Sequence, residues 1–68
     1  MRISISSPSD REKLVAELFY DNEQWAEINQ ESAGFQLELY PRRDGKPWSF
    51  ELHDALNALR IAKARLAG

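Results

Sequence analysis

The sequence predicts an α+β fold: an antiparallel β-meander of four to five strands with one C-terminal helix packed on one face. Two observations predict it. Between residues 2 and 50, short segments alternate apolar and polar side chains and are separated by turn-forming residues, which is typical of strands buried on one face. From about Leu52 to Leu66, apolar residues recur at helical spacing instead. The 68 residues form one domain, 1–68.

Five segments are predicted as strands, in the order Arg2–Ser6, Leu14–Tyr20, Gln24–Gln30, Phe35–Tyr40 and Trp48–Phe50. Residues 7–10, 21–23 and 31–34 supply the turns, and residues 41–47, with their Asp44-Gly45 turn signal, form a hairpin loop. The fourth strand alternates most cleanly, with Phe35, Leu37 and Leu39 facing inward. The helix is expected to bury one stripe, made of Leu52, Ala55, Leu56, Leu59, Ala62 and Leu66.

One helix can cover only one face of such a sheet, so the other face is predicted to meet water, a loop or a partner. In the register where Glu27 lies between Glu17 and Glu38, every cross-strand pair is side-consistent. Two rows then share the outer face. The aromatic row is Phe19, Trp25 and Tyr40, and the acidic row is Glu17, Glu27 and Glu38.

The acidic row is unfavourable for folding, because like charges opposite one another weaken a sheet. Large aromatic residues are common in binding hot spots. The two rows together therefore suggest a docking surface for a basic protein partner. Two other interpretations stay open: the face is only solvated, or Arg11 or Arg42 folds over it and neutralises the glutamates.

The charges are segregated along the chain, although the net charge is only -2. The middle of the chain is acidic, while the loop after the fourth strand carries Arg42, Arg43 and Lys46 beside Tyr40 and Trp48. Cations next to aromatic rings can hold phosphates and stack bases, so nucleic-acid binding through this loop is the alternative function. The overall acidity argues against it, because phosphate contacts dominate such affinity.

The residues give little basis for catalysis or metal binding. His53 is the only histidine, no glycine-flanked nucleophile is present, and the absence of cysteine removes thiolate ligands and disulfides. We therefore expect no enzyme activity, no catalytic residues, no cofactor and no metal. The lack of cysteine, of a signal peptide and of an apolar stretch of about 18 residues favours a cytoplasmic protein.

The run FQLELYPRRDGKPWSFELHDALNAL, residues 35–59, together with YDNEQWAEINQE before it, resembles a group of small, mostly uncharacterised bacterial proteins. Proteins of this size and build are similar to immunity proteins that neutralise secreted bacterial toxins, many of them basic nucleases. The resemblance implies an inhibitor of a basic toxin and assigns no role to any residue. The leading hypothesis is thus a protein–protein interaction module. A third hypothesis is a homodimer formed through an exposed edge strand.

Overall fold

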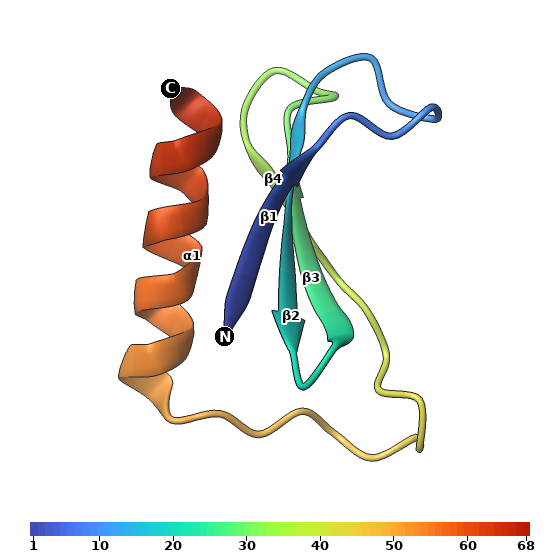
Figure 1. The fold of residues 1–68 in the computed structure, drawn as a ribbon, viewed down its shortest axis with the longest axis vertical. Coiled ribbons are helices and arrows are strands. Elements are labelled where there is room, and N and C mark those ends of the chain that lie inside the picture. The colour runs from blue at the N-terminus through green and yellow to red at the C-terminus, as the bar shows by residue number, and fades with distance from the viewer.

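A computed structural model describes residues 1–68 and contains one antiparallel sheet and one helix (Figure 1). The elements are β1 (Arg2–Ser6), β2 (Val15–Tyr20), β3 (Glu23–Asn29), β4 (Gln36–Leu39) and α1 (Leu52–Ala67). The strands lie in the order β1-β2-β3-β4, so each pairs with its neighbour in the chain. The predicted α+β meander with a C-terminal helix on one face is confirmed.

The predicted fifth strand, Trp48–Phe50, is wrong. β4 ends at Leu39, and the chain then runs past the end of the sheet that carries the β2–β3 turn to reach α1 (Figure 1). The Asp44-Gly45 turn does form, with Gly45 at φ 78° and its N–H donating to the Arg42 carbonyl at 3.0 Å, but it closes a loop and not a hairpin. Trp48 and Phe50 nevertheless pack inward against the core, as predicted.

The β2–β3 hairpin has a tighter turn than the sequence suggests. Asp21 and Asn22 both have positive φ, 50° and 65°, which is the two-residue turn that matches the twist of a hairpin. Next to this turn, Phe19 pairs with Gln24. Farther from the turn, where apolar residues face the core, Leu18 pairs with Ala26. One residue, Trp25, is left over between them and forms a β-bulge.

The bulge places Trp25 on the helix side of the sheet. Its side chain is 5% exposed and belongs to the same core as Ala58 and Ala62 of α1, and its ring lies 4.8 Å from that of Phe50. The prediction that Trp25 faces outward in a row with Phe19 and Tyr40 is therefore wrong, because strand alternation breaks where a bulge inserts an extra residue.

Helix α1 begins at Leu52, where the apolar spacing predicts it. Glu51 is the N-cap, and its carboxylate accepts the Asp54 N–H at 2.9 Å. This hydrogen bond, with a second contact to His53, lowers the pKa of Glu51. Gly68 ends the helix with φ 122° and donates to the Ala64 carbonyl.

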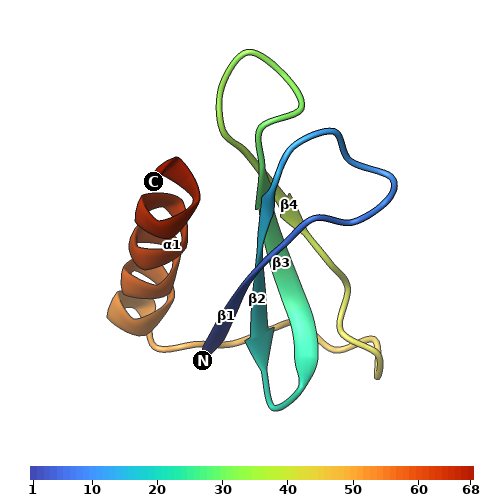
Figure 2. The ribbon, with the colours of Figure 1, turned by 45° about the horizontal axis from the view of Figure 1, so that its top comes forward.

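Only part of the predicted helical stripe is buried. Of its six residues Ala62 and Leu66 are buried, together with Ala58, which the prediction did not include, while Leu52 and Leu56 remain 64% and 54% exposed. The helix also leaves part of the sheet's core face uncovered. It packs on β2 and β1, so β4, at the far edge of the sheet, has no helix over it (Figure 2). Four strands span about 14 Å between their outer axes, and a helix is about 10 Å across, so one helix leaves an edge strand uncovered.

The opposite face of the sheet is partly covered by the β1–β2 loop, which swings out on the side away from α1 (Figure 1). Val15, the first residue of β2, points to the same face of the sheet as Glu17 and Phe19. It is fully buried, although it does not belong to the core under the helix. The outer face is therefore not the flat, open surface that alternation alone implies.

Candidate functional site

The acidic row expected on the outer face is present. Glu17 lies opposite Glu27, and Glu27 lies opposite Glu38, in the register predicted from the sequence. The aromatic row beside it is incomplete, since Trp25 has moved to the core face. The predicted acidic-aromatic surface is thus reduced to its carboxylates, Phe19 and Tyr40.

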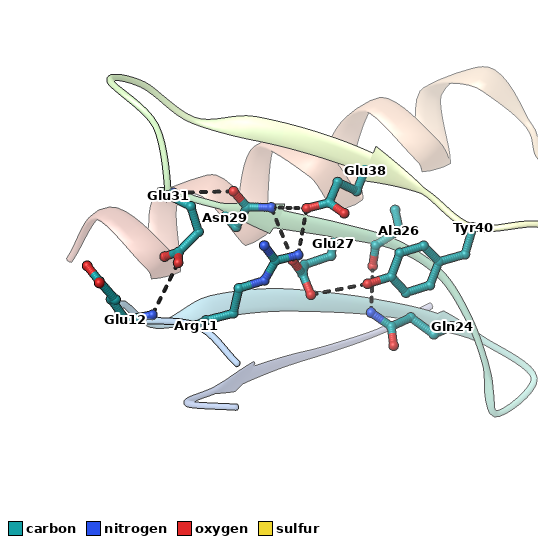
Figure 3. Close-up of polar contacts among 9 residues, drawn as sticks. All are labelled: Arg11, Glu12, Gln24, Ala26, Glu27, Asn29, Glu31, Glu38 and Tyr40. Atoms are coloured by element: carbon teal, nitrogen blue, oxygen red, sulfur yellow. Dashed lines mark hydrogen bonds and ion pairs between the residues drawn. The ribbon is translucent and has the colours of Figure 1, made fainter. Parts of the chain in front are cut away.

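Arg11, from the β1–β2 loop, forms ion pairs with two of the three glutamates of the acidic row (Figure 3). Its Nη2 lies 2.9 Å from Glu27 Oε2 and 2.7 Å from Glu38 Oε2. The side chain of Glu27 is only 6% exposed, and that of Glu38 is 43% exposed. Burial lowers the pKa of Arg11, but the charges of Glu27 and Glu38 outweigh this effect and leave the pKa raised. The guanidinium therefore stays charged and acts as a fixed counter-ion.

Asn29 and Tyr40 complete a hydrogen-bonded cluster around the same carboxylates (Figure 3). The Asn29 side-chain amide donates to Glu27 at 3.1 Å and also to Glu38, and the Tyr40 hydroxyl donates to Glu27 Oε1 at 3.2 Å. Partial burial and the nearby charge of Glu27 raise the pKa of Tyr40. With donors on both sides, Glu27 is a satisfied internal anion that anchors a loop.

The remaining predicted outer residues, Glu17 and Phe19, are half-buried. The Phe19 ring carries the Arg2 guanidinium at 4.1 Å from its centroid, so this aromatic already has a cationic partner within the chain. Glu17 forms no ion pair. It is therefore the carboxylate of the row whose charge is left uncompensated.

The basic loop expected to contact nucleic acid is partly occupied by internal contacts. Arg42 lies 3.4 Å from Asp44 and has its guanidinium 5.6 Å from the Trp48 ring centroid. The side chain of Arg43 is 80% exposed and lies 4.0 Å from Glu23, and Lys46 is exposed. Lys46 is therefore the one predicted cation without an ion pair.

The histidine and the acidic side chains do not gather into a metal-binding cluster. The side chain of His53 is 87% exposed and contacts Glu51 at 3.1 Å. No three or more His, Cys, Asp or Glu side chains are arranged to hold a metal ion. The single helix is too short and too polar to cross a membrane.

The largest departure from a closed core is an exposed apolar surface on β4 and α1, which we call the β4–α1 patch. Its members are large apolar residues that stay 40% to 68% exposed: Phe35, Leu37, Leu39, Leu52 and Leu56. Leu37 lies opposite Ile28, and Leu39 lies opposite Ala26, both of which are buried core residues. The β4 leucines therefore project from the core face of the sheet but remain 49% and 68% exposed.

One contact links the helix part of the patch to the segment just before β4. Leu52, Leu56, Leu59 and Lys63 follow at intervals of three and four residues and share one flank of α1. Lys63 lies 5.5 Å from the Phe35 ring, which ties this flank to the start of β4. The opposite flank of the helix, with Asp54 and Ile61, borders a depression next to Ile3 of β1.

Sequence reasoning placed all five patch residues in the core, because their alternation and helical spacing are those of buried residues. The signal that could have revealed the patch is the ratio of elements: one helix for four strands leaves more apolar positions than one helix can cover. The sequence offers Arg11 only as one of two cations that could cover the glutamates, and it gives no signal for Asn29.

Comparison with protein-family models, with curated proteins and with solved structures finds no match to this chain. The residues of the carboxylate cluster and of the β4–α1 patch therefore carry the functional argument.

Proposed function

We propose that this protein is a small protein–protein interaction module that binds through the β4–α1 patch. The observation that carries the proposal is the exposure of Leu37 and Leu39, at 49% and 68%, on the face of the sheet that elsewhere forms the core. Large apolar side chains left this exposed on the core face of a small domain are typical of an interaction site. Burying such leucines is the main source of free energy for association.

The contact surface differs from the acidic-aromatic face expected from the sequence. A basic partner that bound there would have to displace Arg11, which already contacts Glu27 and Glu38 within 3 Å. Glu17 and the half-exposed Glu38 leave a weaker acidic region, which suits electrostatic steering more than anchoring. The narrower proposal of a cytoplasmic bacterial immunity protein depends on this region and is tested by Glu17→Lys.

Nucleic-acid binding through Arg43 and Lys46 is the alternative, supported by their exposure beside the Arg42–Trp48 contact. A gel shift with single-stranded and double-stranded DNA and RNA at low salt tests it. A salt-dependent shift that is lost in Arg43→Ala with Lys46→Ala supports this alternative, and no shift at low salt excludes it.

The proposed function is tested by capturing partner proteins on the immobilised chain. The amount retained by the native chain is compared with the amount retained by two matched variants. Leu39→Lys places a charge in the patch, and Glu17→Lys makes a charge change on the opposite face. We expect a partner that is retained by the native chain and by Glu17→Lys but lost in Leu39→Lys. A partner lost only in Glu17→Lys would contradict the β4–α1 patch and favour the acidic face. Circular dichroism of each variant confirms that the fold persists.

A further inference from the structure

The free edge of β4 carries unpaired backbone groups beside its exposed leucines. The Tyr40 N–H donates to the Trp25 carbonyl of β3 at 3.0 Å. Because backbone groups alternate in direction along a strand, those of Glu38 and Gln36 also point to β3, while those of Leu37 and Leu39 point to the free edge. The same residues therefore present apolar side chains and free hydrogen-bonding groups, and this combination is a template for another strand.

We propose that β4 pairs with β4 of a second copy of this chain, antiparallel, about a two-fold axis at Leu37. This inference rests on the proposed function, because it names the occupant of the β4 part of the patch. In this register Leu37 lies opposite Leu37 of the second copy, and Phe35 lies opposite its Leu39. The backbone groups that face each other are the ones left free by β3, and two-fold self-pairing is the commonest way in which identical chains associate.

The charges on β4 select this register. With the axis at Leu37, Gln36 faces Glu38 of the second copy, and an amide can donate to a carboxylate. With the axis at Glu38, the two copies of Glu38 would lie directly opposite each other, which is unfavourable. The strand contains no lysine, proline or bulge that would block pairing at the edge. Within β1, the other edge, only Ile5 is an exposed large apolar residue.

The association is tested first by sedimentation of the full chain from micromolar to millimolar concentration. We expect a monomer–dimer equilibrium, because a four-residue strand offers a small interface. Leu37→Lys is expected to weaken it by roughly tenfold or more, since it places like charges at the axis. Leu56→Lys, on the helix flank, is the matched control and is expected to leave the dimer largely intact.

The register is tested by disulfide cross-linking. The native chain has no cysteine, so each single-cysteine variant can form a disulfide only with a second copy of itself. Leu37→Cys is expected to form a symmetric disulfide, since Cα atoms in a hydrogen-bonded antiparallel pair are about 5.5 Å apart, within the range of about 4.4–6.8 Å that disulfides need. Ile5→Cys on β1 is expected to stay reduced. Cross-linking of Ile5→Cys without Leu37→Cys would overturn the proposal.

A monomer at every concentration would also overturn the second copy as the occupant. That result leaves the proposed function intact if the capture experiment still yields a partner lost in Leu39→Lys and kept in Glu17→Lys. Failure of both experiments would remove the β4–α1 patch as an interaction surface.

Discussion

Leu39 lies directly opposite Ala26 across the β3–β4 pair, yet Ala26 is fully buried and Leu39 is 68% exposed. The two residues share a face of the sheet, but Ala26 belongs to the core that includes Ala58 and Ala62 of α1, whereas Leu39 lies on the edge strand β4. This contrast defines the part of the core face that the chain does not cover by itself.

The exposure of Leu39 predicts a small effect of truncation on stability. Leu39→Ala is expected to change the free energy of unfolding by about 0.5 kcal/mol or less, as surface substitutions do. Ile28→Val, a smaller deletion at a position 6% exposed, is expected to cost about 1 kcal/mol. Urea denaturation of the dilute protein measures both. A larger loss for Leu39→Ala than for Ile28→Val would show that Leu39 is packed.

Trp25 is predicted to be a core residue and not a contact residue. Trp25→Ala is expected to lower the free energy of unfolding by about 3–5 kcal/mol, enough to unfold most of a marginally stable domain. Trp25→Phe keeps an aromatic ring beside Phe50 and removes an indole N–H that is buried without a hydrogen-bond partner, so it should keep the fold. Near-ultraviolet circular dichroism and urea denaturation separate the two variants, and a folded Trp25→Ala protein would contradict the assignment.

Arg11 is predicted to stabilise the fold by compensating a buried carboxylate. Arg11→Met leaves Glu27 charged and nearly buried, so it is expected to lower the Tm clearly. Adding Glu27→Gln removes the uncompensated charge and should recover a large part of that loss. Glu17→Gln, which affects a carboxylate without an ion pair, should change the Tm little. A double variant no more stable than Arg11→Met would indicate that Arg11 acts through packing alone.

Tyr40 is predicted to weaken the fold at alkaline pH. Partial burial and the charge of Glu27 raise its pKa in the folded state, so the folded protein holds this proton more tightly than the unfolded chain does. The stabilisation is fully present below the unfolded pKa of about 10 and is lost as pH rises through the folded pKa. Tyrosinate absorbance should extend beyond pH 10, and Tyr40→Phe should remove that late portion. An unchanged titration curve in Tyr40→Phe would contradict the contact with Glu27.

Local patterns in the sequence determined most of the secondary structure. Alternation and turn residues placed four strands, and the recurrence of apolar residues at helical spacing placed α1. The pairing of Glu27 with Glu17 and Glu38 also followed from the sequence, because a shift by one residue would turn every apolar side chain to the wrong face.

Tertiary structure alone decided which apolar residues were buried and which charges were free. A two-residue turn at Asp21 and Asn22 forced the bulge that moved Trp25 into the core. A loop residue, Arg11, crossed the sheet to reach Glu27, 16 positions away in the chain. Periodicity reports which way a side chain points, and burial depends on what other elements lie there. The width of a single helix left β4 uncovered, and the β4–α1 patch is the result.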